Sequence, residues 1–229
     1  MALAIILARG GSERLPRKNL ALLCGKPLVA HSIEAACQAR TVTRVVVSTD
    51  DPDIAAVAES YGAGVIPRPA HLSTSTATSE SALLHALDYL EDMEGYSPDL
   101  VVFLQPTSPY RLPEDIDGAV ATFYATGADS VFSSVPELFT GRWRKNPDGT
   151  AYPINYDPHK RPRSQDYPIE YLGIGSIYVF RPSLLRETGC RTGGKIVMYE
   201  MPKLRQFQVD TQEDLDLLEV IMQGMKVSA

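Results

Sequence analysis

Short apolar runs alternate with helical stretches through the first 135 residues, and this alternation admits few architectures. Each run is β-compatible, and a polar or glycine-containing loop and then a segment of helical periodicity follow it. The predicted strands cover residues 2–8, 44–48, 64–67, 100–104 and 130–135, and the predicted helices cover 28–38, 52–61, 79–91 and 113–126. Strands that alternate with helices predict an α/β fold with a doubly wound, mainly parallel sheet.

The alternation stops between Pro136 and Pro168. Six prolines and six Lys or Arg residues fall in this stretch, which shows no helical period. It could be a long surface loop, but structureless loops of this length are uncommon in compact domains unless they are functional. We therefore predict a protruding arm, inserted at about residues 136–170, that docks on another subunit. The α/β pattern resumes at 174–180 and 195–201, and a last helix starts at Thr211.

Length and composition favour one domain over residues 1–229. A chain of 229 residues can bury a full core without disulfides or a structural metal. No apolar run approaches the ~20 residues of a membrane helix, and no basic leader precedes residues 2–8, so we expect a cytoplasmic protein. The net charge of −6 argues against nucleic-acid and anionic-membrane partners.

In an open parallel sheet, ligands bind at the carboxyl ends of the strands, near a switch in strand order. Three polar loops, 9–18, 48–51 and 105–111, follow directly on predicted strands. A fourth, 210–214, follows the extended run 205–209. We expect these four loops to converge on one crevice.

The first loop reads ARGGSERLPRKN and combines two glycines with four cations. Gly10 and Gly11 allow close approach of the backbone, so amide groups can face an anion. The cations are Arg9, Arg14, Arg17 and Lys18. The loop lacks the GxxxxGK[ST] spacing of a Walker A motif, but its charge and its glycines suit a triphosphate.

This loop also resembles the N-terminal signature of the cytidylyltransferases that activate sialic acid and related ulosonic acids as CMP-sugars. Five further blocks occur in family order at family-like spacing: STDD at 48–51, RPAHL at 68–72, LQPTSPYR at 104–111, GSIY at 175–178 and VDTQEDLDL at 209–217. The resemblance implies a nucleotidyltransferase-like fold. It also implies that CTP and a nonulosonic acid react to give a CMP-sugar and pyrophosphate, with Mg²⁺ as cofactor.

By position, the resemblance implies a role for individual residues. The nucleotide would be bound by Arg9, Gly10, Gly11, Ser12, Arg14, Lys18, Asn19 and Arg68. The sugar would contact Gln105, Arg163 and Ile174, and Asp210 would bind the metal. Arg9, Lys18 and Asp210 are the expected catalytic residues. The arm matches the family's dimerisation arm, which implies a homodimer in which the arm reaches the partner's active site.

Three positions depart from the family pattern. Gln208 stands where a second metal-binding acid is common, Ser75 replaces an Asp, and Ile174 replaces an Asn that contacts the sugar. We expect Ile174 to favour an acid with a methyl group or deoxy carbon at that place, such as legionaminic or pseudaminic acid.

The sequence leaves two questions open, the role of Asp210 and the choice among related functions. Asp210 could be the N-cap of the last helix rather than a metal ligand. The alternatives for function are a Kdo-type or other sugar nucleotidyltransferase and a catalytically inactive nucleotide-binding protein.

Overall fold

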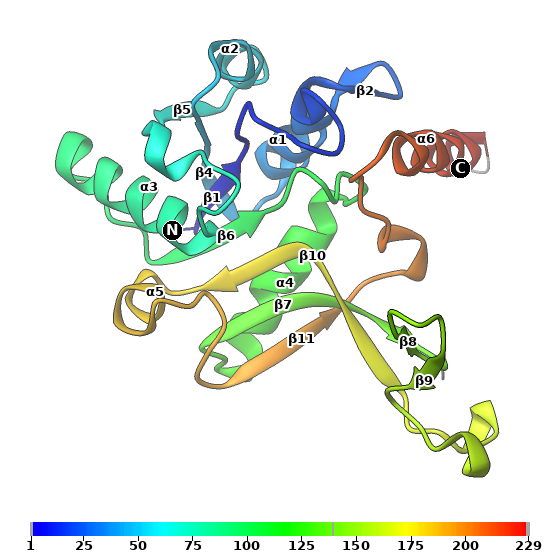
Figure 1. The fold of residues 1–229 in the computed structure, drawn as a ribbon. Helices are drawn as coiled ribbons and strands as arrows, with labels where there is room; N and C mark the ends of the chain where they lie inside the picture. The colour runs from blue at the N-terminus through cyan, green and yellow to red at the C-terminus, as the bar shows by residue number, and fades with distance from the viewer. Residues whose placement is uncertain (1, 139, 228–229) are drawn as a thin grey trace.

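A seven-stranded sheet forms the centre of the protein in the computed structural model, which describes residues 2–138 and 140–227 (Figure 1). Its spatial order is β11-β7-β10-β6-β1-β4-β5. The strands are β1 (Ala2–Leu7), β4 (Val42–Thr49), β5 (Gly64–Pro67), β6 (Leu100–Leu104), β7 (Ser130–Glu137), β10 (Glu170–Phe180) and β11 (Ile196–Glu200). β10 pairs antiparallel with β6 and β7, whereas the other ladders are parallel. The predicted mainly parallel sheet is confirmed.

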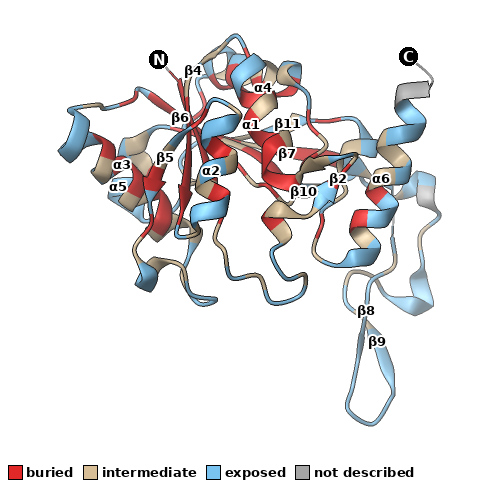
Figure 2. Ribbon diagram, turned by 90° about the horizontal axis from the view of Figure 1, so that it is seen from above, coloured by how far each residue is buried: buried red, intermediate tan, exposed pale blue. Residues whose placement is uncertain are grey.

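Helices cover both faces of this sheet. Helices α1 (Leu28–Gln38), α2 (Pro52–Ser60) and α4 (Pro113–Thr126) contribute most of their buried apolar residues to one cluster. Those of α3 (Ser79–Glu94) and α5 (Pro182–Thr188) belong to a second cluster. Figure 2 shows the buried residues gathered on the sheet and on the inner sides of the helices.

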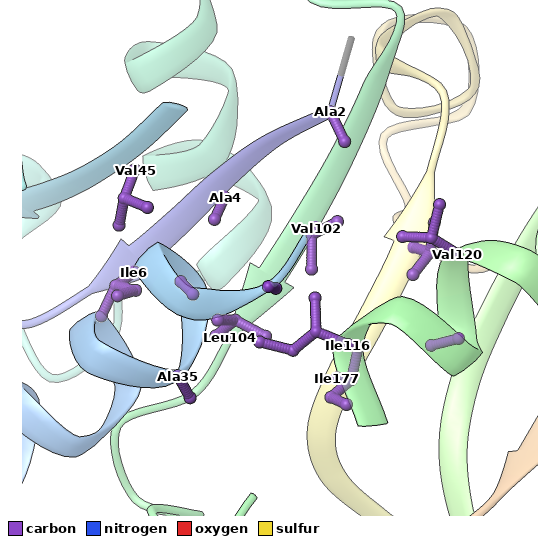
Figure 3. Close-up of a cluster of buried hydrophobic side chains, with 14 of the residues drawn as sticks. Ala2, Ala4, Ile6, Ala35, Val45, Val102, Leu104, Ile116, Val120 and Ile177 are labelled. Carbon is purple, nitrogen blue, oxygen red and sulfur yellow. The ribbon is translucent and has the colours of Figure 1, made fainter. Parts of the chain in front are cut away.

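The central strands are apolar on both sides because helices cover both faces. All five residues of β6 are buried, and so are Ala2 to Ile6 of β1. Figure 3 shows Leu104 of β6 beside Ile116 of α4 and Ile177 of β10, with Ile6 of β1 on the other side of Leu104. A strand buried on both faces reads as a continuous apolar run, which is why the sequence located these strands well.

The order of the strands reverses at β1. From β1 the chain proceeds to β4 and β5 on one side, and it then crosses to β6 on the other side of β1. The loops after β1 and β6 therefore leave the same edge of the sheet next to each other. This is the position at which open α/β sheets bind ligands.

The C-terminal helix lies beside a small hairpin rather than over the sheet. The hairpin consists of β2 (Leu22–Leu23) and β3 (Lys26–Pro27), and it packs with α6 (Gln212–Val227) through a third apolar cluster. Leu215 and Leu218 of α6 and Leu23 of β2 belong to this cluster. Neither the hairpin nor α5 was predicted, since both are short and rely on tertiary packing. No helix in the described part of the chain combines the length and apolarity needed to span a membrane.

The proline-rich segment extends away from the sheet between β7 and β10 (Figures 1 and 2). It contains a hairpin of β8 (Trp143–Lys145) and β9 (Ala151–Pro153), followed by two 3-10 turns, η3 (Pro158–Lys160) and η4 (Ser164–Asp166). β10 begins at Glu170, four residues before the predicted strand, because it continues to pair with β7 toward the arm. The arm's role in dimerisation stays a prediction.

Candidate functional site

A cavity of about 480 Å³ lies at the switch in strand order, between the loops that follow β1 and β6. Seven residues that the sequence assigned to the site line it: Arg9, Ser12, Arg14, Lys18, Asn19, Arg68 and Asp210. Pro106 and Thr107, from the loop after β6, complete one wall, and the Val209 amide donates to the Thr107 carbonyl at 2.7 Å. Loops 9–18, 105–111 and 210–214 thus converge as expected.

The loop 48–51 supports the glycines of the first loop from behind. The Gly10 amide donates to Asp50 Oδ1 at 3.0 Å. A Cβ on Gly10 would lie 2.7 Å from Asp51 Oδ2, so a larger residue cannot occupy this place without a shift. Asp51 is itself fixed, because its carboxylate accepts from the amides of Asp53 and Ile54 at the start of α2. Gly10 and Gly11 therefore shape the loop without lining the cavity.

A tight turn at the end of the first loop brings Lys18 and Asn19 inward. Arg17 has a left-handed conformation with φ 53°, and its guanidinium pairs with Asp53 on α2. The turn η1 (Lys18–Leu20) follows directly. The Asn19 side chain is buried and donates to the Arg9 carbonyl at 2.9 Å, which joins the two ends of the loop.

Asp210 faces two cations of the first loop across the cavity. Lys18 Nζ lies 2.8 Å from Asp210 Oδ1, and Arg14 Nη1 lies 3.6 Å from Asp210 Oδ2. The Lys18 side chain is 15% exposed, whereas that of Asp210 is 43% exposed. The carboxylate is therefore paired and still open to solvent and ligands.

The cap of α6 is formed by other residues. Thr211 Oγ1 accepts from the Asp214 amide, and the Asp214 carboxylate accepts from the amides of Asp210 and Thr211. This reciprocal arrangement is a capping box. The interpretation of Asp210 as the N-cap is wrong, and its side chain is free of that structural task.

Arg68 provides a buried cation on another wall. Its Nε donates to Ser48 Oγ at 3.0 Å, and Nη2 donates to the Ser48 carbonyl. Burial lowers the pKa of Arg68 to about 10, with Asp50 opposing and Arg9 adding to the shift. The guanidinium stays charged at neutral pH and faces the cavity from a rigid position.

The sequence analysis missed the wall formed by residues 72–82. Leu72, Thr74, Ala77, Thr78 and Ser79 line the cavity together with Ala82 of α3. Thr78 caps α3, since its Oγ1 accepts from the Ser81 amide. The signal was present as the run STSTATS, which is rich in small hydroxyl residues and precedes a helix.

The three expected sugar-side residues do not line the cavity. Gln105 lies next to it, directly before Pro106. Arg163 is in the arm, where it forms a two-pronged ion pair with Asp166. The Ile174 side chain is 1% exposed and belongs to the main core cluster, so its assignment to the sugar site is corrected: the core, not a ligand, holds this side chain.

The side chains of the cavity fit a magnesium ion whose ligands come partly from the protein and partly from the phosphates of a nucleotide. Within the described residues no group of three or more His, Cys, Asp or Glu side chains could bind a metal alone. Asp210 supplies one partly exposed carboxylate. Mg²⁺ is commonly held by one or two carboxylates together with phosphate oxygens, which agrees with a single protein ligand.

The chain is similar to known proteins over most of its length. Residues 3–228 match the family model described as Cytidylyltransferase. N-acylneuraminate cytidylyltransferase A of Danio rerio is 36% identical over 218 residues, which are 93% of this chain and 48% of the relative. CMP-N,N'-diacetyllegionaminic acid synthase of Legionella pneumophila is 45% identical over 150 residues, 64% of this chain and 62% of the relative. Pseudaminic acid cytidylyltransferase of Campylobacter jejuni is 29% identical over 222 residues, 96% of this chain and 95% of the relative.

The fold has a counterpart among solved structures. The structure of CMP:2-keto-3-deoxy-manno-octonic acid synthetase complexed with CTP matches with a TM-score of 0.70 and 22% identity. The match covers 98% of this chain and 99% of that chain. At this identity the likeness establishes the fold. The chain spans about half the length of the Danio rerio relative.

Proposed function

The chain belongs to the cytidylyltransferase family, and from this premise we propose that it transfers the cytidylyl group of CTP to a nonulosonic acid of the sialic-acid type. One observation carries the proposal: four cations, Arg9, Arg14, Lys18 and Arg68, and the carboxylate of Asp210, which does not cap α6, line one cavity at the switch in strand order. The relatives named for acylneuraminate, legionaminate and pseudaminate transfer support this choice of acceptor.

The triphosphate of CTP is assigned to the first loop. Lys18 and Arg14 now pair with Asp210, and Arg9 lines the same cavity. Charged hydrogen bonds to phosphate are among the stronger polar contacts in proteins. The nucleoside end is assigned to the wall of Arg68 and residues 72–82, which offers a fixed cation and small hydroxyl groups.

We assign Mg²⁺ to Asp210. The ion would supply charge neutralisation of the phosphates when bound. In the reaction the anomeric hydroxyl of the acid attacks the α-phosphorus in line and releases its proton to solvent, while the bond from phosphorus to the bridging oxygen breaks and pyrophosphate leaves. Arg9, Arg14 and Lys18 stabilise the negative charge on the leaving group, so positioning and electrostatics supply most of the rate.

The acid is assigned to the open side of the cavity beside Gln105. A Gln side chain offers a donor and an acceptor to hydroxyl or amide groups of the sugar. The cations that line the cavity are assigned to the nucleotide, whereas Arg163 lies in the arm and is left for the sugar carboxylate. We propose a homodimer in which Arg163 of each subunit serves the cavity of the other.

We also propose that the protein acts in the cytoplasm, where CTP is available. The product would be the activated sugar that glycan synthesis consumes.

The test is pyrophosphate release from CTP in the presence of Mg²⁺ and a panel of acids. The panel contains N-acetylneuraminic, legionaminic, pseudaminic and Kdo acids, and the CMP-sugar is identified by mass. We expect a nonulosonic acid to give the highest kcat/KM. Turnover confined to Kdo would favour the eight-carbon alternative. CTP binding without release for any acid would favour an inactive nucleotide-binding protein.

A further inference from the structure

The strand β10 is interrupted by a bulge beside the candidate site. Its pairing with β7 lapses between Gly173 and Tyr178, and Gly175 adopts φ 67°. Polar side chains replace the missing ladder there. Ser108 Oγ and Gln208 Nε2 donate to the Ile174 carbonyl, at 3.2 and 2.6 Å, and the Ile177 amide donates to Ser133 Oγ. Bulges next to active sites commonly serve to direct a side chain.

Gln105 packs directly against this bulge. A Cβ on Gly175 would lie 2.7 Å from Gln105 Oε1 and 3.3 Å from Gln208 Nε2. The backbone at Gly175 therefore sets how close these two amides come to it. A shift of the bulge would move the Gln105 side chain, which we assign to the sugar acid.

Arg111 joins the bulge to the loop that carries Gln105. Its side chain is buried, and its three donor groups reach three parts of the fold. Nη2 donates to the Gln105 carbonyl at 2.5 Å, Nε donates to Ser176 Oγ at 3.0 Å, and Nη1 donates to Ser32 Oγ on α1 at 2.7 Å. Burial lowers the pKa of Arg111 to about 9, opposed by Asp115.

A cation in this place is costly for folding, because desolvation of a charge is unfavourable even when hydrogen bonds compensate it. An apolar side chain could fill the same space with less penalty. What the guanidinium adds is a planar fork that holds Gln105 and Ser176 in fixed relation. The bond to Ser32 anchors the fork to the helix layer.

We propose that Arg111 is a positioning residue for the acceptor acid. It fixes the Gln105 backbone and the bulge at Gly175–Ser176 together, and so it sets the place of the Gln105 side chain. The proposal rests on the proposed function, because it assigns Gln105 to the acid.

A matched pair of variants tests the proposal. Ser32 and Ser176 are both fully buried, and each accepts one hydrogen bond from Arg111. Ser176→Ala removes the hydrogen bond between Arg111 and the bulge, whereas Ser32→Ala removes only the hydrogen bond between Arg111 and α1. We expect Ser176→Ala to raise KM for the acid roughly fivefold, with KM for CTP unchanged within about twofold. Ser32→Ala should leave both constants unchanged within about twofold, while both variants lower the melting temperature to a similar extent.

A third variant changes the backbone of the bulge itself. Gly175→Ala places a methyl group against Gln105 Oε1 at a positive φ, so it should show the same selective rise in KM for the acid. Equal changes in KM for the acid in Ser32→Ala and Ser176→Ala would show that Arg111 is merely structural and would overturn the proposal. Wild-type protein without turnover on any acid would instead refute the proposed function, and the present inference with it.

Discussion

Asp210 is held in the cavity by ion pairs to Lys18 and Arg14, while the capping box of α6 is completed by Thr211 and Asp214. The side chain that lines the cavity and the side chain that caps α6 therefore belong to neighbouring residues, Asp210 and Thr211. Because of this separation, a substitution can remove the charge of Asp210 without weakening the helix.

We expect Asp210→Asn to lose most Mg²⁺-dependent turnover but to melt within a few degrees of the parent. The loss should be about 10- to 100-fold, since a charged contact to a bound ion or phosphate contributes roughly 1.5–3 kcal/mol. Activity as a function of Mg²⁺ concentration, with thermal denaturation in parallel, checks both parts. Full turnover in the variant would show that the Asp210 carboxylate is not needed for the reaction.

If Mg²⁺ binds Asp210 as proposed, Lys18 and the metal ion compete for the same carboxylate when no nucleotide is present. We therefore expect Lys18→Met to bind CTP more weakly and yet to bind Mn²⁺ alone about threefold to tenfold more tightly than the parent. The increase reflects the loss of a competing, mostly buried cation.

Calorimetry with Mn²⁺ alone and with CTP alone measures these two affinities. Lys26→Met is the matched control, because Lys26 pairs with Glu34 outside the cavity. Weaker Mn²⁺ binding in Lys18→Met than in the parent would contradict the competition between Lys18 and the metal.

At the scale of elements, the start of α6 has its own pH dependence. Burial raises the pKa of Asp214, but hydrogen bonds from Asp210 and Thr211 and the charge of Lys18 outweigh it, so the pKa lies below its ordinary value. Because the folded pKa is the lower one, the carboxylate stabilises the fold above the unfolded pKa of about 4. That stabilisation is lost as the pH falls through the folded pKa.

Asp214→Ala should therefore lower the melting temperature at pH 7 by several degrees, as expected for a lost cap of about 1 kcal/mol. The difference from the parent should shrink as the pH is lowered below about 4. Thermal denaturation between pH 7 and pH 3 measures it. Asp216→Ala, on the same helix, is the control and should change the melting temperature less. A constant difference at all pH values would argue against the carboxylate as its source.

The central strands could be predicted from the sequence, because a strand that is buried on both faces appears as a continuous apolar run. The bulge at Gly175 and the short hairpin β2–β3 could not, since tertiary contacts and not local propensity define them. The same distinction holds in the site. The first loop could be predicted as part of the site from its cations and glycines. The role of Arg111 could not, because the sequence does not show that its side chain is buried.

Alignment by position also misled at Ile174. The sequence places this residue where the family has a sugar-contacting Asn, but a side chain can turn to either face of a strand. Here it packs in the core, and the backbone carbonyl of the same residue faces Gln208 and Ser108. The inferred preference for deoxy acids therefore has no support from this side chain.

At the scale of the whole molecule, the arm and its base expose large apolar side chains. They are Leu138, Trp143, Tyr152, Ile154, Ile169 and Tyr171. Exposed apolar groups gathered on one segment commonly mark an interface. A symmetric pair of arms is the simplest way to cover them.

We expect the protein to sediment as a dimer and Ile169→Asp to shift it toward the monomer, because a charge at an apolar interface is desolvated without a partner. Turnover should fall with the dimer population, since Arg163 of each subunit is proposed to serve the other cavity. Leu217→Asp, at an exposed position on α6, is the control and should stay dimeric. A fully active wild-type monomer in sedimentation would refute both the dimer and its role.

β10 extends from the base of the arm at Glu170 to Phe180, which pairs with Ser130 at the start of β7, and the bulge at Gly175 lies between these ends (Figure 1). One strand therefore connects the base of the arm with the backbone against which Gln105 packs. In the proposed dimer, a subunit docked on the arm would restrain the outer end of β10, and an acid bound at Gln105 would restrain its middle. Both reduce the freedom of the same few peptide units, and such linkage is reciprocal. In such a dimer, substrate would tighten the association of subunits by the same factor by which association tightens substrate.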